Sequence, residues 1–272
     1  MAEYCEIKDR PAYASIQHGW FRILDNETKD LKVSKIPGVT FLCWSKKIER
    51  LFKKNNLEKN IVAIGAPFVY LYDEKKPNIK TERNVLIFPP HTGELENRPS
   101  NFVNHKQLIE HVTVEYEGPY SVCLFYQDMK KDIIKIYKEK NWKIFCCGNR
   151  ENLEFLNYFI NMVSLHQNII VCEMTSAYLY AIYMGKDVKI LNKFNRFYTH
   201  RNFFAQKVDE DPWIYYQDSY PFLSIDSFEE KLKYAKLELG YENKKTKEEI
   251  KKLMGWDSFL KGLLSKFISL IK

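Results

Sequence analysis

The sequence predicts an α/β protein with a Rossmann-like parallel sheet, a small partial α/β lobe before it and a helical tail after it. Three observations lead to this prediction. From residue 85 onward, short apolar segments alternate with amphipathic helical patterns. The apolar segments are nearly continuous, as in parallel strands that helices cover on both faces. The chain is 45% hydrophobic and 15% aromatic, which is enough for a sizeable core.

The main sheet is expected from five strands that alternate with four helices. The strands are predicted at 84–89, 120–126, 142–147, 168–174 and 187–191. The helices are predicted at 103–116, 128–140, 151–166 and 175–184, with Asp128 as the cap of the second.

The segment before residue 75 repeats this order on a smaller scale. Strands are expected at 13–17, 39–44 and 61–65, with a helix over 45–56. The polar stretch 72–84 contains Pro77 and is the expected linker. The resulting domains are an N-terminal lobe (1–75), a Rossmann-like lobe (84–243) and an amphipathic tail (244–272).

Charge and composition narrow the classes of function. Lys and Arg number 42 against 35 Asp and Glu, a net charge of +7. This excess fits a phosphate-bearing ligand or an anionic membrane, and it fits a lysine-rich solvated surface equally well. No zinc-finger spacing, RNP signature or arginine-rich strip occurs, so no nucleic acid partner is expected.

The six cysteines mostly fall in apolar strand-like segments, where they are expected to be small buried residues. No spacing typical of a metal site occurs, so no metal is expected. The N-terminus does not read as a signal peptide, and no apolar run approaches the roughly 18–20 residues that span a bilayer. The expected location is the cytoplasm.

In open α/β sheets, ligands bind beyond the carboxyl ends of the strands. Thr175 and Ser176 stand where a strand ends and a helix begins, which is a natural position for an anion. Simple N-capping is the competing interpretation. Glu173, just before them, is expected either to bind a ribose or to be a solvated loop carboxylate.

Two loop histidines are candidates for proton transfer. His18 lies in "SIQHGW" and is expected to act as a general base, or else to be a turn residue packed against Trp20. His91 lies in "LIFPPHTG", where it could donate a proton to a leaving phosphate. Arg150 is expected either to pair with a phosphate or to form an ion pair with Glu151 at a helix start.

Four segments in this order resemble the landmarks of GT-B type glycosyltransferases of bacterial surface-polysaccharide synthesis, including polyol-phosphate, sialic acid and Kdo transferases. They are "SIQHGW", "CWSKKIERLFKKNN" with "IVAIGAPF", "LIFPPHTG" and "TSAYLYAIYMGKDV". Two departures stand out: the first lobe is short, and Thr92 follows the histidine where sialyltransferases have a His-Pro dipeptide. We expect the first lobe to be truncated, to be a minimal acceptor lobe, or to be completed by another chain.

The resemblance implies transfer from a nucleotide-activated sugar or polyol phosphate to a glycan or lipid-linked acceptor, without a cofactor. It implies His18 and His91 as catalytic residues. It implies donor binding by a second set of residues: Thr92, Arg150, Glu173, Thr175 and Ser176. Two alternatives stay open, a UDP-sugar 2-epimerase-like enzyme and a non-catalytic lobe that binds a nucleotide or a partner protein.

The tail 256–272 carries apolar residues at helical spacing opposite Ser and Lys. Such a helix is expected to lie on the inner membrane, or to pack on its own domain or on a second copy of the chain. The first of these would bring the enzyme to a lipid-linked acceptor.

Overall fold

The computed structural model describes residues 1–8, 10, 12–20, 40–55, 60–77, 81–90, 104–149, 151–191 and 225–258. The chain divides into two compact units. The first combines Met1–Lys75 with Lys233–Lys272, and the second is Lys76–Leu232. Each unit has its own parallel sheet, so the expected α/β class is confirmed.

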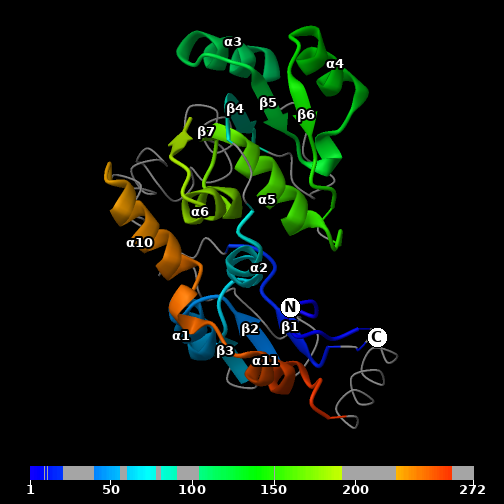
Figure 1. The fold of residues 1–272 in the computed structure, drawn as a ribbon, viewed down its shortest axis with the longest axis vertical. Helices are drawn as coiled ribbons and strands as arrows, with labels where there is room; N and C mark the ends of the chain where they lie inside the picture. The colour runs from blue at the N-terminus through cyan, green and yellow to red at the C-terminus, as the bar shows by residue number, and fades with distance from the viewer. Residues whose placement is uncertain are drawn as a thin grey trace. The chain divides into compact units, whose positions relative to one another are not determined.

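The described part of the second unit holds a sheet of five strands in the order β6-β5-β4-β7-β8, with every neighbouring pair parallel (Figure 1). The strands are β4 (Glu82–Phe88), β5 (Tyr120–Cys123), β6 (Lys143–Phe145), β7 (His166–Val171) and β8 (Val188–Ile190). The helices are α3 (His105–Glu115), η3 (Tyr126–Asp128), α4 (Lys131–Glu139), α5 (Phe155–Leu165) and α6 (Ser176–Tyr183).

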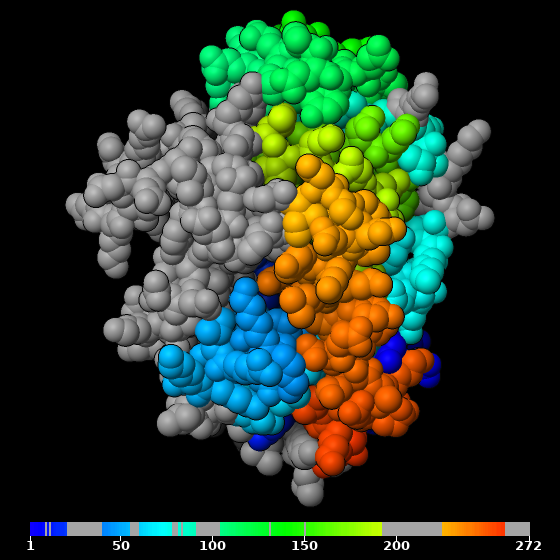
Figure 2. All heavy atoms as spheres, turned by 90° about the vertical axis from the view of Figure 1, so that its left-hand side faces the viewer, coloured from blue at the N-terminus to red at the C-terminus, as the bar shows by residue number. Residues whose placement is uncertain are grey.

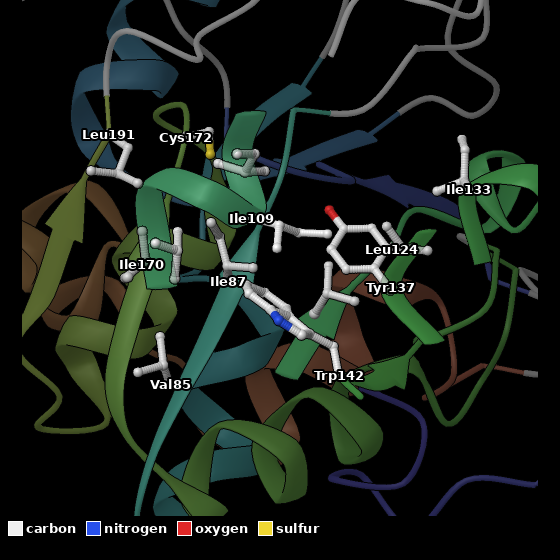
Figure 3. Close-up of a cluster of buried hydrophobic side chains, with 13 residues drawn as sticks. Val85, Ile87, Ile109, Leu124, Ile133, Tyr137, Trp142, Ile170, Cys172 and Leu191 are labelled. Atoms are coloured by element: carbon white, nitrogen blue, oxygen red, sulfur yellow. The ribbon is translucent and has the colours of Figure 1, made fainter. Parts of the chain in front are cut away.

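Helices cover both faces of this sheet because its strands are apolar on both faces. Val85 and Ile87 of β4 pack in one cluster with residues of α3 and α4, whose side chains point toward one another in Figure 3. Leu86 and Phe88, which alternate with these residues along β4, are on the other face. Leu86 is buried there, and the ring centroid of Phe88 is 5.7 Å from that of Phe159 in α5. In Figure 1, α3 and α4 accordingly lie on one side of the sheet, and α5 and α6 on the other.

The described part of the first unit holds a sheet in the order β1-β2-β3, again parallel. Its strands are β1 (Ala14–Ile16), β2 (Thr40–Cys43) and β3 (Asn60–Ala63). Its helical elements are α1 (Lys46–Asn55), α2 (Pro67–Lys75), η6 (Tyr241–Asn243) and α11 (Lys247–Met254). The helix α10 (Phe228–Glu238) runs across the boundary between the units.

Alternate residues of β2 enter two separate cores. Phe41 and Cys43 pack with α1. Leu42 packs on the other face, in a cluster that joins the N-terminal residues to α11 and Trp256. The second face of this small sheet is therefore covered by segments from both ends of the chain.

Residues 238–245 lie along the carboxyl ends of the strands of the first unit. The N–H of Ala66 donates to the Leu239 carbonyl at 2.8 Å. The N–H of Lys46, at the start of α1, donates to Oδ1 of Asn243 at 3.1 Å. In Figure 2 this segment (orange) lies beside α1 (blue). The edge of the sheet where a ligand is usually bound is thus in contact with the protein's own backbone.

Several elements differ from the sequence-based expectation. Helix α2 was not expected, and it takes up the first four residues of the expected linker 72–84. The strand expected over 120–126 ends at Cys123. Helix α10 was not expected either, and the residues from Lys233 onward belong to the first unit instead of ending the second.

The expected membrane-binding tail begins with a buried residue. Trp256 follows α11 in a turn, is 5% exposed and packs in the core of the first unit. It is therefore not on the lipid-facing side of an amphipathic helix, and 259–272 lie outside the described residues. Within the described ranges, every helix is too short or too polar to cross a bilayer.

Gly240 is predicted to be irreplaceable where the 238–245 segment meets β2. Its φ is +65°, and a Cβ there would lie 1.8 Å from the Trp44 carbonyl oxygen. Gly185 also has a positive φ, +83°, but open space around it. We expect Gly185→Ala to lower the free energy of unfolding by about 1–2 kcal/mol and Gly240→Ala by about 3 kcal/mol or more, measured by urea denaturation. Equal losses would contradict the close contact.

Glu49 of α1 ties its helix to β3. Its Oε2 accepts the N–H of Ala63 at 3.0 Å, and Lys46 and Lys53 each approach the carboxylate to 2.6 Å. Burial alone would raise the pKa of Glu49, but these three partners outweigh burial and lower it to about 2.

Because the folded-state pKa of Glu49 is depressed, its contribution to stability is complete above about pH 4.5 and is lost as the pH falls toward 2. We expect Glu49→Gln to reduce the free energy of unfolding at pH 7 by about 1–2 kcal/mol, and the difference from wild type to shrink in acid. The exposed Glu248 of α11 supplies the control, Glu248→Gln. A Glu49→Gln effect that is constant from pH 7 to pH 3 would contradict this account.

Candidate functional site

The strand order places a change of direction between β4 and β7. From β4 the chain adds β5 and β6 on one side, then crosses to add β7 and β8 on the other. If the strands of this unit are numbered from β4 as strand 1, their order in the sheet is 3-2-1-4-5, which is that of a doubly wound sheet. Ligands of such sheets bind beyond the carboxyl ends of the two strands where the direction changes. The segments that follow β4 and β7 are therefore the candidate site.

Glu173, Thr175 and Ser176 all lie in the segment after β7. The N–H of Cys172 donates to the Phe88 carbonyl at 3.1 Å and continues the ladder one residue beyond the strand. Glu173 follows and is only 4% exposed. The interpretation of Glu173 as a solvated loop carboxylate is therefore wrong. Burial raises the pKa of the neighbouring Cys172 thiol, and the charge of Glu173 raises it further.

Thr175 is the N-cap of α6, as one of its two interpretations predicts. Its hydroxyl oxygen accepts the N–H of Ala177 at 3.3 Å, and its carbonyl accepts the N–H of Tyr178 at 3.1 Å. The hydroxyl of Ser176 is hydrogen-bonded to Tyr180, one turn later. Both hydroxyls are thus at the positive end of a helix, half-buried.

The segment after β4 is described as far as Pro90. His91 and Thr92, which follow directly in the sequence, lie outside the described residues, and so does Arg150 after β6. Their predicted roles stay predictions.

Beyond β5, Asp128 is 3% exposed in the turn η3. It does not cap α4, whose N-cap is Lys130 without a side-chain hydrogen bond. The assignment of Asp128 as a cap is therefore wrong, because the helix begins three residues later than predicted.

Lys186, in the "GKDV" part of the resemblance, lies at the opposite edge of the sheet. Its ammonium group donates to the carbonyl of His166 at 2.8 Å, to that of Ser164 at 3.2 Å and to the hydroxyl of Thr81 at 3.3 Å. His166 begins β7 and Thr81 precedes β4, so these contacts are at the amino ends of the strands. Lys186 is therefore not beside Thr175.

His18 belongs to the first unit and is exposed in the loop after β1. Gln17 holds this loop to β2: its Oε1 accepts the N–H of Trp44 at 2.9 Å, and its Nε2 donates to the Gly19 carbonyl at 2.7 Å. The indole of Trp20 donates to Glu238 at 2.8 Å. His18 is thus exposed in a loop in which hydrogen bonds hold Gln17 before it and Gly19 and Trp20 after it.

Two contacts between residues distant in the sequence were missed. His105 contacts the hydroxyl of Tyr137 at 2.8 Å through Nδ1, and burial lowers the pKa of His105 to about 4. Cys123 ends β5 and Cys147 lies just after β6, close enough that the interaction between the thiols raises the pKa of Cys123 and lowers that of Cys147. The sequence carried no signal for either, because each pair is joined only by the packing of separate elements. Among the described residues, no group of three or more His, Cys, Asp or Glu could hold a metal ion.

Comparison with known proteins adds no assignment to this geometry. No model of a known protein family matches the chain. The search of curated proteins also gives no match.

The capping role of Thr175 leads to a stability prediction. Thr175→Ala removes the acceptor of the Ala177 N–H and should lower the free energy of unfolding by about 1 kcal/mol. Thr175→Ser keeps a hydroxyl and should lose much less. Thermal or urea denaturation of both variants tests this, and equal losses in the two variants would show that the methyl group of Thr175, not its hydroxyl, is what stabilises the helix start.

Proposed function

We propose that this chain is a GT-B-like transferase that takes a sugar or polyol phosphate from a nucleotide-activated donor and passes it to a glycan or lipid-linked acceptor in capsule or lipopolysaccharide assembly. One observation carries the proposal. The strand order changes direction between β4 and β7, and Glu173, Thr175 and Ser176 directly follow β7. Two parallel α/β units in one chain also agree with the doubled Rossmann plan of that class.

The donor diphosphate is assigned to the start of α6. A phosphate there would compete with the Thr175 hydroxyl for the Ala177 N–H, whose present hydrogen bond is long at 3.3 Å. Charge-assisted hydrogen bonds to phosphate are roughly twice as strong as neutral ones. The exchange would therefore favour the bound anion, and Ser176 would add a second hydroxyl. The net charge of +7 favours the approach of such a donor.

The remaining roles follow the resemblance. Glu173, beside the phosphate position, would accept hydrogen bonds from the donor ribose. His91 and Thr92 follow β4, the other strand at the change of direction, and would protonate and bind the leaving phosphate. Arg150 would pair with the same phosphates. His18, in the first unit, would take the proton from the acceptor hydroxyl.

A second candidate is a protein that binds the nucleotide without transferring the group. The carboxyl edge of the first sheet favours this candidate, because residues of the chain itself lie against it. Asn243 accepts the first N–H of α1, and Gly240 packs against the carbonyl of Trp44. An acceptor would have to bind beside this edge instead of at the helix terminus.

Nucleotide binding tests the donor site. The purified chain is screened by thermal shift against CMP, CDP, UDP and GDP and their sugar or polyol conjugates. At least one compound should raise the melting temperature, and Ser176→Ala should weaken its binding by about tenfold, as expected for one lost hydrogen bond to a charged group.

The control is Thr246→Ala, which removes the N-cap of α11 in the first unit. It should lower stability and leave nucleotide affinity unchanged. Absence of any shift with all compounds, or equal weakening by Thr246→Ala, would overturn the donor site.

Release of free nucleotide from the conjugate that binds measures transfer to the acceptor or to water. His18→Ala should reduce this rate by about 10²–10⁴ and leave nucleotide affinity intact. Unchanged turnover would show that His18 is not the base. Binding without turnover in the wild-type chain, across the acceptors tested, would favour the second candidate.

A further inference from the structure

His105 is the first residue of α3, the first described helix after β4. This helix ends at Glu115, shortly before β5 begins at Tyr120, so its end lies near the amino edge of the sheet. A helix of 11 residues is roughly 16 Å long and returns the chain from one edge of the sheet to the other. His105 is therefore near the carboxyl edge, where the ligands of such sheets bind.

Tyr137 of α4 is the contact that places His105 at this edge. Tyr137 packs in one cluster with Leu124 and Cys172, the first residues after β5 and β7. In Figure 3 its hydroxyl points away from Trp142, which precedes β6 at the amino edge. Nδ1 of His105 lies 2.8 Å from this hydroxyl oxygen, and the two rings meet edge to face with their centroids 5.5 Å apart. The pair thus lies beside the ends of the two strands that flank β4.

The hydroxyl of Tyr137 determines which nitrogen of His105 carries the proton. Tyr137 is fully buried, so its O–H needs an acceptor inside the protein. Within the described part of the chain, that acceptor is Nδ1 of His105. Burial lowers the pKa of His105 to about 4, so the ring is neutral near pH 7. A neutral ring that accepts through Nδ1 has its proton on Nε2.

The Nε2–H group of His105 is the end of the ring that faces away from the Tyr137 hydroxyl. The ring is half-buried, and the flanking Asn104 and Lys106 are exposed. None of the described residues accepts a hydrogen bond from Nε2. The start of α3 therefore offers one N–H donor, held in direction by Tyr137, at the edge where the sheet changes direction.

We propose that His105 contacts the bound nucleotide and that its Nε2–H donates a hydrogen bond to an acceptor atom of this ligand. The inference rests on the proposed function, which assigns the nucleotide to this edge. Because α3 and α6 cover opposite faces of the sheet, His105 and Ser176 border the change of direction from opposite sides. A nucleotide between them would meet Ser176 through its phosphates and His105 through another part of the molecule. Tyr137 does not touch the ligand and acts as a positioning residue for the His105 ring.

An asparagine variant separates the ligand contact from the contact with Tyr137. The side chain of asparagine reaches about as far as Nδ1 and can accept from the Tyr137 hydroxyl, but it has no atom at the position of Nε2. His105→Asn should keep the melting temperature near that of wild type. It should weaken binding of the tightest ligand among CMP, CDP, UDP and GDP by about threefold to tenfold in calorimetric titration, as expected for one lost hydrogen bond. His105→Gln keeps an N–H near Nε2 and should lose less.

The matched control is His111, which lies in the same helix toward the amino edge. Its Nε2 contacts Oε1 of Glu115 at 3.0 Å. His111→Asn should leave nucleotide affinity unchanged. The double variant His105→Asn/Ser176→Ala should lose the product of the two single losses, because independent contacts add in free energy.

Nitrogen-15 spectra of the histidine rings test the contact in the wild-type chain, so the result does not depend on the folding of a variant. The ring of His105, assigned through its backbone signals, should carry its proton on Nε2 at pH 7. Saturating nucleotide should shift the Nε2 signal of His105 and leave the ring signals of His111 in place. In Tyr137→Phe the His105 ring should show both tautomers, which a purely structural role of Tyr137 would not produce.

A proton on Nδ1 of His105, or ring signals that saturating nucleotide leaves unchanged, would overturn the proposal. So would an affinity that falls with Ser176→Ala and not with His105→Asn, and the donor site at α6 would then stand without this contact. A loss with His105→Asn and none with Ser176→Ala would support the His105 contact and contradict the phosphate position. Failure of all four nucleotides to bind would overturn both.

Discussion

The parallel pairing of β4 with β7 is the constraint on which the second unit depends. Leu86, Ile87 and Phe88 stand opposite Ile169, Ile170 and Val171, and the Cys172–Phe88 hydrogen bond prolongs the pairing. The segments that follow must then separate, because α3 covers one face of the sheet and α6 the other. This separation sets Glu173 inside the protein and Thr175 at the start of α6. Wherever a ligand binds in this unit, the same pairing decides which residues it can meet.

The first unit uses the same strand arrangement differently. Its sheet is also parallel, yet residues 238–245 return to its carboxyl edge and Asn243 takes up the N–H at the start of α1. Gly240 makes this possible because only a residue without a side chain fits against Trp44. Two similar sheets thus present different edges. One carries hydroxyls at a helix start, and the other is in contact with residues 238–245, with His18 exposed in the loop after β1.

Local patterns predicted most strands and helices of the fold, because continuous apolar segments and helical periodicity are properties of short stretches. Helix α2 could also have been predicted, because Pro67 is its first residue and proline is favoured at the first position of a helix. Features that depend on residues distant in the sequence could not be predicted in this way. They include the burial of Glu173, the position of Trp256 in the core of the first unit and the proximity of Cys123 and Cys147. The role of Thr175 as an N-cap could be predicted from its residue type and position. Its place at the strand pair where the sheet changes direction could be known only once the order of the strands was known.

Hydrogen–deuterium exchange tests the central claim, that the start of α6 binds the donor phosphates. The amides of Ala177 and Tyr178 are followed with and without the nucleotide diphosphate that binds most tightly. Slower exchange at these amides in the presence of the nucleotide is the predicted result, because the anion would accept the Ala177 N–H, whose present bond to Thr175 is long at 3.3 Å, and would hold the first turn of α6 in place. Unchanged exchange at the start of α6 under saturating nucleotide, with protection elsewhere in the chain, would contradict the assignment.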